Sequence, residues 1–558
     1  MLPRSRAEFV IGPTGHLPFC ISAHPFYAAC VALGHVAIVL HAHLPFVRHP
    51  EHRDFLEERW LFEAIAECYL PLLAAFDRLE RDGIPFRITV SLSPPLVAML
   101  RDPLLQQRFE AHMGKIDRLL DRELARTATD SSIGPVVHFY AERQRQAWAM
   151  WHRIEHDVAL AFASLARRGR LEIWTCGATH AFLPALIHHP RIQRAQIQIA
   201  VDSHIRALSL RPRGIWLPEC GYAPGIDRVL VDHGLAYTAL ESHALAYASP
   251  RPRFATATPV VTTAGLACVG RDTAASAEVW SKTGGYPGHT SYREFYRDVG
   301  YDGAEADVRE FLAADGTRQH TGLKYYRITH AKGLHAKEPY DPLIARSLAF
   351  AHGADFVRKR ADQIRGLSFG MPVPPLVFAP YDAELFGHWW FEGPDFIEGV
   401  FRAMANAGDV VSPTTIGEYM SEWPTHDLAE PEVSSWGAGG YAGVWLDPGT
   451  GWMLRHVDHA AREVVSIVRR HGRDSGVRGR AARQAVREFL LLISSDWAFL
   501  IKTDTAPHYA RARFETHLAR FLRLAAEVDE AIDETWLTGL ESRDNLFATL
   551  PLDWAWDD

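Results

Sequence analysis

The chain lacks the features that mark several classes of protein. It has no long basic run and a formal net charge of −8, which argues against nucleic acid or an anionic membrane as its main partner. No apolar run reaches transmembrane length without a His, a Pro or a charge, and no internal repeat is visible. With 47% hydrophobic and 23% charged residues, the composition is that of a soluble globular protein.

Cysteine is also scarce. The six cysteines are scattered and form no Cys-x-x-Cys pair, which favours reduced, buried thiols in a cytoplasmic protein. Arg4 and Arg6 precede a patchy apolar stretch, 17–33, that faintly resembles a signal peptide, but proline, histidine and an acidic residue interrupt the region. We therefore expect residues 1–33 to be a poorly ordered N-terminal extension and not a secretion signal.

Tryptophan and histidine, by contrast, are abundant, at 16 and 29 residues. Trp-rich clefts suit sugars because a pyranose face is apolar and its rim is polar, although large cores also use Trp. At 558 residues the chain is too long for one ordinary core, so two or three domains are expected.

The most informative stretch is 214–222, Gly-Ile-Trp-Leu-Pro-Glu-Cys-Gly-Tyr. A short apolar run ends in Glu219, which stands between Pro218, a stiff residue, and Gly221, which permits a tight turn. Trp216 and Tyr222 add aromatic rings. The pattern indicates a buried strand that ends in an acid among aromatic faces, as a sugar-cleaving site requires. A surface loop with a helix N-terminal Glu is the alternative.

Similar apolar runs recur, each followed by polar residues, at 35–40, 86–90, 171–175, 236–240, 324–329 and 375–380. Such runs are typical of strands buried on both faces of a parallel sheet, and in parallel barrels the chemistry gathers at the carboxyl ends of the strands. The polar residues at these ends are His41, His43, Thr175, His180, Glu219, Glu241 and Asp382.

This pattern predicts an α/β barrel domain over 34–410 with a helical insertion at about 96–168. A short strand and helix are expected near Val411 to Glu422, and the C-terminal domain, 411–558, is otherwise helical. Within it, Ser494-Ser495-Asp496-Trp497 interrupts an apolar helix. Asp496 is either a helix cap or a residue that reaches back to the barrel.

Glycoside cleavage uses two carboxyl groups that flank the scissile bond, roughly 5–5.5 Å apart in a retaining site. Glu219 and Asp382 are the natural pair: Glu219 attacks the anomeric carbon and Asp382 protonates the leaving oxygen. Glu384 is a rival for the acid. His41 and His43 share one face of a strand, so they could bind a divalent metal or donate hydrogen bonds to sugar hydroxyls.

Five segments together resemble glycoside hydrolase family 57, and within it the 1,4-α-glucan branching enzymes. They are His41-Ala42-His43-Leu44-Pro45, 174–180 (Trp-Thr-Cys-Gly-Ala-Thr-His), 216–222 (Trp-Leu-Pro-Glu-Cys-Gly-Tyr), 381–389 (Tyr-Asp-Ala-Glu-Leu-Phe-Gly-His-Trp) and Ser494-Ser495-Asp496-Trp497. The resemblance implies an incomplete barrel of seven strand–helix units plus a helical C-terminal domain. It also implies a retaining mechanism without metal or other cofactor, with Glu219 as nucleophile and Asp382 as proton donor.

The branching subgroup implies further contacts with an α-glucan substrate. Segments 270–272, 285–288 and 434–437 resemble its substrate-binding segments, which adds Arg271, Gly288, Trp436 and Asp496 to the expected substrate-binding residues His41, His43, His180 and Trp216. Two departures stand out. Thr505 replaces a frequent Gln, and the segment between Glu241 and Gly270 is shorter than the mobile, Tyr-bearing loop of related enzymes, with Tyr247 as its only Tyr.

We therefore expect a branching enzyme that cleaves an α-1,4 bond and transfers the fragment to a 6-hydroxyl. An α-amylase or 4-α-glucanotransferase with the same two carboxylates is the alternative, since a shortened lid favours water as the acceptor. A metal-dependent hydrolase or deacetylase using His41 and His43, and an inactive glycogen-binding protein, belong to other classes.

Overall fold

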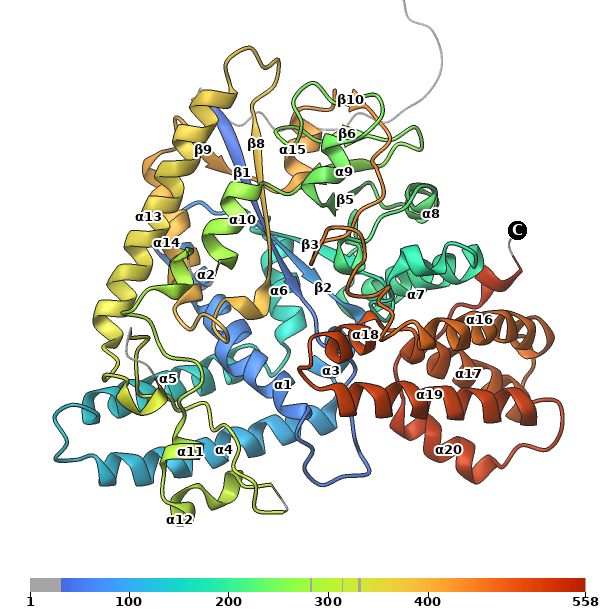
Figure 1. The fold of residues 1–558 in the computed structure, drawn as a ribbon, viewed down its shortest axis with the longest axis horizontal. Coiled ribbons are helices and arrows are strands. Elements are labelled where there is room, and N and C mark those ends of the chain that lie inside the picture. Colours follow the sequence, from blue (N-terminus) through green and yellow to red (C-terminus); the bar gives the residue numbers. More distant parts are fainter. Residues whose placement is uncertain (1–31, 282–283, 314, 330–332, 557–558) are drawn as a thin grey trace, which may run out of the picture. The chain divides into compact units, whose positions relative to one another are not determined.

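The computed structural model describes residues 32–281, 284–313, 315–329 and 333–556. The N-terminal extension expected at 1–33 therefore falls, except for its last two residues, outside the described residues. The core of the described chain is a curled, open sheet in which seven neighbouring strands are parallel (Figure 1). In sheet order these are β7 (Ala267–Gly270), β5 (Tyr237–Leu240), β4 (Gly214–Trp216), β3 (Leu171–Cys176), β2 (Ile88–Leu92), β1 (Gly34–Ala42) and β8 (Leu376–Asp382). The expected incomplete barrel of seven parallel strands is confirmed.

Strand β1 lies next to the edge strand β8 and pairs with three strands, β2, β8 and β9 (Val411–Pro413). All nine of its residues are buried, which explains why its sequence is a continuous apolar run without polar alternation. It pairs with β8 along almost its whole length, and the register sets His41 beside Asp382. The polar residues that follow these two strands are thereby brought to the same edge of the sheet.

Short strands extend the sheet beyond the parallel set. Strand β6 (Val260–Val261) runs antiparallel to β7, β10 (Asp427–Leu428) pairs with β6, and β9 (Val411–Pro413) lies beside the first residues of β1. The short strand expected near Val411 is β9, and together with β10 it continues the sheet past residue 410, the expected end of the barrel domain.

One expected strand is absent. The run 324–329 forms no strand in the described chain and takes part only in isolated bridges, Arg293 to Arg327 and Tyr326 to Pro339. Its side chains explain the difference: Lys324 and Arg327 reach neighbouring loops, and the Tyr325 ring packs on Tyr140. The apolar character of this run therefore serves packing outside the sheet.

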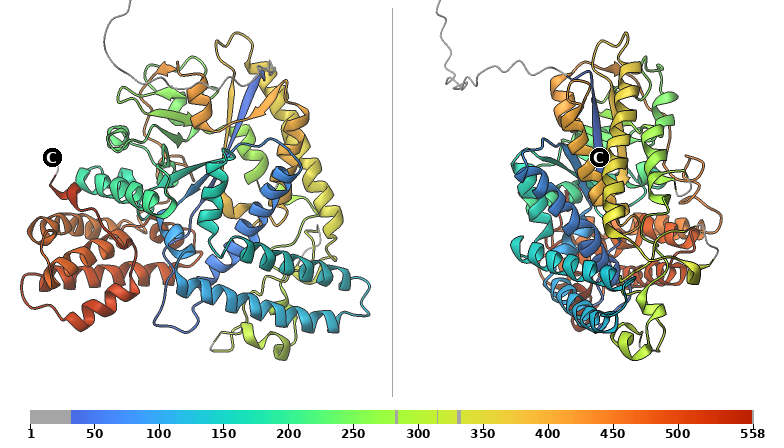
Figure 2. Two further views of the ribbon diagram at one scale, coloured as in Figure 1. Left: turned by 180° about the vertical axis from the view of Figure 1, so that it is seen from behind. Right: turned by 90° about the vertical axis from the view of Figure 1, so that its left-hand side faces the viewer.

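Helices cover the sheet on both faces (Figures 1 and 2). Residues 94–167 form the expected helical insertion, in which Asp102 and Asp157 cap two of the helices. The helices up to residue 208 are α1 (Glu58–Glu63), α2 (Leu70–Arg81), α3 (Pro94–Leu100), α4 (Pro103–Arg126), α5 (Gly134–Arg153), α6 (Val158–Arg167) and α7 (Pro190–Leu208). Those from 226 to 422 are α8 (Ile226–Asp232), α9 (Ser242–Ala246), α10 (Thr273–Trp280), α11 (Val299–Asp302), α12 (Glu305–Val308), α13 (Pro342–Leu367), α14 (Gly393–Asn406) and α15 (Ile416–Glu422).

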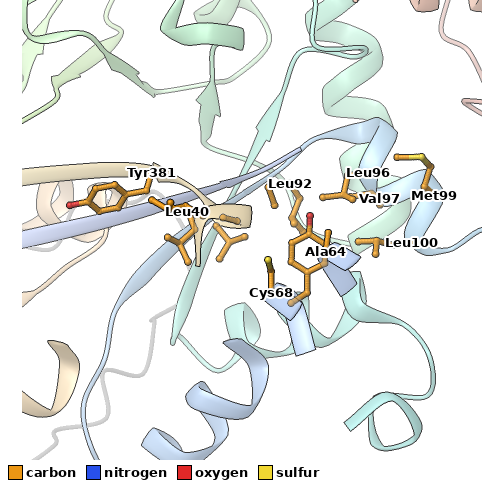
Figure 3. Packing of buried hydrophobic residues seen from close by; sticks show 14 of the residues in the cluster. Leu40, Ala64, Cys68, Leu92, Leu96, Val97, Met99, Leu100 and Tyr381 are labelled. Carbon is orange, nitrogen blue, oxygen red and sulfur yellow. The ribbon is translucent and has the colours of Figure 1, made fainter. Parts of the chain in front are cut away.

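A single turn of π-helix, η1 (Ala64–Tyr69), joins α1 to α2. Its Ala64 and Cys68 pack in a buried apolar cluster with Leu40 of β1, Leu92 of β2 and Tyr381 of β8 (Figure 3). Turns of π-helix inside α-helices are rare, and those that occur are often at functional sites. This turn therefore indicates a functional site at the neighbouring strand ends.

The C-terminal region is helical, as expected. It contains α16 (Trp452–His471), α17 (Val477–Leu492), α18 (Ser495–Lys502), α19 (Pro507–Glu527) and α20 (Glu534–Arg543). It joins the barrel beside β3, where Ser494 bridges to Ala181 and the Ser495 amide donates to the His180 carbonyl at 3.0 Å. Among the described residues, no helix is both long and apolar enough to cross a bilayer.

Candidate active site

The carboxyl ends of the strands open into a cavity of about 780 Å³. Its lining includes both expected carboxylates together with several aromatic side chains. Among the lining residues are His41, His43, Trp60, Glu63, His180, Glu219, Arg271, Trp280, Asp382, Glu384, His388, Trp389, Trp436, Trp445, Asp496, Phe499 and Thr505. A hollow of similar volume, about 770 Å³, lies at the opposite ends of β1 and β9. It holds none of the expected site residues, so the candidate site is the first cavity.

Glu219 sits in a strained turn directly after β4. The turn, η3 (Pro218–Cys220), gives Glu219 a φ of 62° and a ψ of 24°, a left-handed conformation that non-glycine residues adopt at a cost, often at functional sites. Gly221 is required here, since a Cβ at this position would lie 2.5 Å from the Phe182 ring. The backbone conformation of this turn therefore sets the direction of the Glu219 side chain.

Two hydrogen bonds hold the Glu219 carboxylate. Trp436 Nε1–H donates to one oxygen at 2.7 Å, and the Ser495 hydroxyl donates to the other at 3.0 Å. Burial raises the pKa of Glu219 to about 7, with the charges of Asp496 and Asp382 adding to the rise and the two hydrogen bonds opposing it. The carboxylate is thus oriented and partly ionised near neutral pH.

Asp382 ends β8 and opens onto the same cavity. Burial, reinforced by the charge of Glu384, raises the pKa of Asp382 to about 8. Glu384 lies in η7 (Ala383–Leu385) and accepts a hydrogen bond from the hydroxyl of Tyr69 in the π-turn. Burial raises the pKa of Glu384 to about 7 while that hydrogen bond opposes the rise.

Three histidines line one wall of the cavity. His41 Nε2 and His180 Nε2 are 3.0 Å apart, and the His43 and His180 rings stack with centroids 3.7 Å apart. Ser91, Ser93 and Ser495 hold the remaining nitrogen of His41, His43 and His180, respectively. Burial lowers the pKa of both His41 and His180, so these two rings are neutral.

Asp496 reaches the cavity from the helical region and bonds His43 Nε2 at 3.1 Å. Burial alone would raise the pKa of Asp496, but His43, His180 and a hydrogen bond from Ser494 lower it to about 2. The ligand atoms of His43, His180 and Asp496 all lie within 4.8 Å of one another. This group could hydrogen-bond a sugar or hold a metal ion, the same two readings that the sequence left open.

The other expected residues differ in their positions. Trp216 is fully buried and does not line the cavity. Its ring stacks on that of His41 with centroids 4.7 Å apart. Arg271 lines it while its Nε donates to Glu241 at 3.3 Å. Tyr247 is 60% exposed and does not line it.

Gly288 also lies outside the cavity. It belongs to η4 (Tyr286–Gly288) and borders a separate hollow of about 260 Å³ together with His289, His352 and Lys359. The preceding Gly285 serves packing, since a Cβ there would lie 2.6 Å from the carbonyl oxygens of Glu278 and Ser281. The substrate contact expected for Gly288 is therefore not supported by its position.

Several cavity residues were missed by the sequence analysis. These residues stand in segments without a recognisable motif, or in a motif in which a neighbouring residue was taken as the functional one. They are Trp60, Glu63, Trp280, Trp389, Trp445 and Phe499. For Trp389 a signal existed, since it closes the expected segment 381–389. The Tyr69 contact with Glu384 had none, because a π-turn leaves no periodic signature.

Comparison with protein families supports this picture. Residues 37–302 match glycosyl hydrolase family 57, and residues 456–554 match the C-terminal region of 1,4-alpha-glucan branching enzymes. Among curated proteins, a 1,4-alpha-glucan branching enzyme of Thermococcus kodakarensis is 32% identical over 92% of this chain and 77% of its own length. A probable 1,4-alpha-glucan branching enzyme of Mycobacterium tuberculosis is 30% identical over 87% of this chain and 90% of its own.

Two solved structures, of an alpha-amylase and of a branching enzyme, superpose closely on the chain. An alpha-amylase from Thermotoga maritima superposes with a TM-score of 0.89 at 37% identity, covering 94% of this chain and 99% of that one. A branching enzyme of the same family from Pyrococcus horikoshii superposes with a TM-score of 0.84 at 30% identity, covering 94% and 97%. The chain therefore belongs to glycoside hydrolase family 57, within its group of 1,4-α-glucan branching enzymes.

Proposed function

We propose that the protein is a 1,4-α-glucan branching enzyme that works by retaining transglycosylation, with Glu219 as nucleophile and Asp382 as acid and base. The observation that carries the proposal is that both carboxyl groups line one cavity, where burial raises the pKa of each, to about 7 for Glu219 and about 8 for Asp382. A retaining pair needs one ionised and one protonated carboxyl group, and the hydrogen bonds from Trp436 and Ser495 favour the ionised form at Glu219.

In the first step the Glu219 carboxylate attacks the anomeric carbon of an α-1,4-linked glucose. The bond from that carbon to the bridging oxygen breaks, and Asp382 gives its proton to the leaving oxygen, which becomes a free 4-hydroxyl. The donor fragment remains as an ester on Glu219. Trp436 and Ser495 hold the carboxylate for this attack.

In the second step a 6-hydroxyl of another glucan attacks the ester. Asp382, now ionised, removes the proton of that hydroxyl, and the new α-1,6 bond forms as Glu219 is released. The Asp496 carboxylate offers hydrogen-bond acceptors to sugar hydroxyls along one wall. The three histidines hold it there, because their ring nitrogens bond one another, Asp496 and the serines behind them. Trp436 offers an aromatic face.

We further propose that the enzyme acts in the cytoplasm in glycogen synthesis, with the barrel up to residue 410 plus β9 to β10 as the catalytic domain. The four cysteines in the described chain are free and buried, as expected in a reducing compartment. The helical region supplies Ser495 and Asp496 to the cleft. Retention of both carboxylates in an open cavity argues against an inactive glycogen-binding protein.

Linkage analysis on amylose tests the activity. New α-1,6 bonds, counted by proton NMR and by debranching, should outnumber new reducing ends, and iodine staining should fall. Reducing ends that rise without new branches would identify an α-amylase, and redistribution of α-1,4 chain lengths alone would identify a 4-α-glucanotransferase. Glu219→Gln should lose at least about 10³-fold in turnover while still binding glucan.

Azide rescue tests the assignment of roles. With α-maltosyl fluoride as donor, Glu219→Ala plus azide should give β-maltosyl azide, because azide displaces fluoride directly. Asp382→Ala plus azide should give α-maltosyl azide, because azide attacks the ester on Glu219. The opposite pattern would exchange the two roles.

The metal-dependent alternative is tested separately. Activity should survive dialysis against a chelator, and elemental analysis of the active protein should find less than about 0.1 metal per chain. Loss of activity in chelator with recovery on adding Zn²⁺ would favour a metal held by His43, His180 and Asp496.

A further inference from the structure

Two consecutive tryptophans after Asp382 have opposite surroundings. Trp390 is 2% exposed and packs among Tyr292, Phe386 and Phe396, whereas Trp389 is 56% exposed and lines the cavity. Packing in the buried core accounts for a tryptophan at position 390. An exposed indole at the wall of a sugar-sized cavity has no such explanation and points to a ligand that covers it.

Trp389 is the outer member of an ordered stack. Its ring lies on that of Phe295 with centroids 4.5 Å apart and an interplanar angle of 21°. Lys324 Nζ in turn lies 4.0 Å from the centroid of the Phe295 ring. One face of the indole is therefore backed by a supporting ring, and more than half of Trp389 remains open for a further flat, apolar surface.

The stack is held in place by buried charges. Arg293 Nη2 donates to the His388 carbonyl at 3.2 Å, and Glu67 of the π-turn accepts from His388 Nδ1 at 2.9 Å. Gly387 has a φ of +123°, and a Cβ there would lie 1.9 Å from the Glu67 carbonyl oxygen. The segment carrying Trp389 is thus locked against η1, and the segment carrying Phe295 is tied to it. The ring is preorganised for binding.

The position of the stack determines which sugar it meets. The Glu219 side of the cavity has its own aromatic walls, Trp436 and Trp445, whereas Trp389 follows Asp382 on the same loop and is joined to it through the Glu384 carbonyl, which accepts from the Trp389 amide at 3.3 Å. The acid must reach the bridging oxygen, so the sugar beyond that oxygen lies on the side of Asp382.

We propose that Trp389, backed by Phe295, is the stacking platform for the leaving glucan chain and then for the acceptor chain that takes its place. This inference rests on the proposed function, because it names the acceptor side of the same site. The apolar face of a glucose ring is the ligand, and the platform favours transfer by keeping an acceptor sugar beside the ester on Glu219 when water competes.

The test uses α-maltosyl fluoride, whose leaving group needs no sugar site, with maltohexaose as acceptor. Trp389→Ala should raise the KM for maltohexaose and lower the ratio of transfer to hydrolysis, each by about three- to tenfold. Trp389→Phe should keep most of the wild-type ratio, and Phe295→Ala should fall between the two. Phe369→Ala removes a ring that is 94% exposed and lies outside the cavity, so it should leave both quantities unchanged.

Binding to an inactive enzyme separates this inference from the function on which it rests. In a Glu219→Gln background, Trp389→Ala should weaken maltohexaose binding by a similar factor in calorimetry. An unchanged Kd together with an unchanged transfer ratio would overturn the platform even if the enzyme branches amylose. A wild type that makes no branches, with maltohexaose binding still dependent on Trp389, would overturn the branching activity and leave the platform as a glucan-binding surface.

Discussion

The indole Nε1–H of Trp436 donates a 2.7 Å hydrogen bond to Oε2 of Glu219, across 217 residues of sequence. The Trp436 amide also donates to the Glu219 carbonyl at 2.9 Å, so the loop that follows the barrel's last strands is fastened to the strained turn after β4. This contact links an aromatic wall of the cavity to the charge state of the proposed nucleophile.

Replacing Trp436 with Phe should shift the acidic limb of the pH–rate profile. The hydrogen bond stabilises the ionised carboxylate and lowers its pKa, so its loss raises the pKa and the nucleophile ionises only at higher pH. We expect the acidic limb of kcat/KM to move upward by about one pH unit. Trp445→Phe is the matched control, because Trp445 Nε1 has no hydrogen-bond partner within the part of the chain that the structure describes. Equal shifts in the two variants would refute the role of the hydrogen bond.

Replacing Glu384 with Gln should shift the basic limb in the other direction. The charge of Glu384 contributes to the raised pKa of Asp382, about 8, so removing that charge lets Asp382 lose its proton at lower pH. The basic limb of kcat/KM should move downward. Tyr69→Phe should cause a smaller shift of the same sign, since loss of its hydrogen bond raises the pKa of Glu384 and leaves it less charged near pH 8. A basic limb that stays in place or rises would contradict the coupling.

Glu219 should also lower the stability of the folded protein at alkaline pH. Folding raises its pKa from 4.5 to about 7, so the folded state binds the proton more tightly, and stability falls as pH rises through this window. Glu219→Gln should therefore raise the free energy of unfolding by roughly 3 kcal/mol at pH 8 relative to its effect at pH 4.

For Asp496 the pH dependence of the free energy of unfolding has the opposite sign, so this residue is the control for Glu219. Its pKa is lowered to about 2, so its stabilising contribution is present above the unfolded pKa and is lost as pH falls towards 2. Asp496→Asn should destabilise the protein at pH 8. Denaturant unfolding at pH 4 and pH 8 measures the Glu219 effect, whereas the cost of Asp496→Asn should be nearly the same at these two pH values, because its window lies below pH 4. A cost of Asp496→Asn that changed between pH 4 and pH 8 in parallel with the effect of Glu219→Gln would show that these charges do not control folding.

Much of the fold could be predicted from sequence because its central strands are buried on both faces. The runs that became β1, β4 and β8 are continuous and apolar, and the acids or histidines after them mark their ends. Strand β7 was missed, since its four residues, Ala-Cys-Val-Gly, carry little strand signal. The run 324–329 misled for the opposite reason: its aromatic residues have strand propensity, but tertiary packing uses them outside the sheet.

The site was predictable only where local sequence sets the geometry. Pro218 and Gly221 predict the turn that holds Glu219. The register of β1 with β8 places His41 beside Asp382. Residues that arrive from distant segments, such as Trp436, were identified through family resemblance and not from spacing. Gly288 matches the motif but borders a separate hollow outside the cavity, so the match alone does not place it against a substrate.

Helices α13 and α14 pack side by side (Figure 1), and two glycines of α13 provide a matched test of that packing. A Cβ on Gly353 would lie 2.7 Å from the Val400 amide nitrogen, whereas a Cβ on Gly366 would meet nothing within 4 Å. Gly353→Ala should therefore force the helices apart and destabilise the protein by about 1–3 kcal/mol.

Gly366→Ala should instead stabilise the protein by up to about 1 kcal/mol, because alanine restricts the unfolded chain and favours helix without a clash. Thermal or denaturant unfolding of the two variants gives the comparison, and both substitutions remove the same conformational freedom of glycine from the unfolded chain. Any difference in sign therefore reports the contact with α14. If both substitutions stabilised the protein, the close approach at Gly353 would have no energetic consequence, and the α13–α14 interface would tolerate a wider spacing behind β8 and its Asp382.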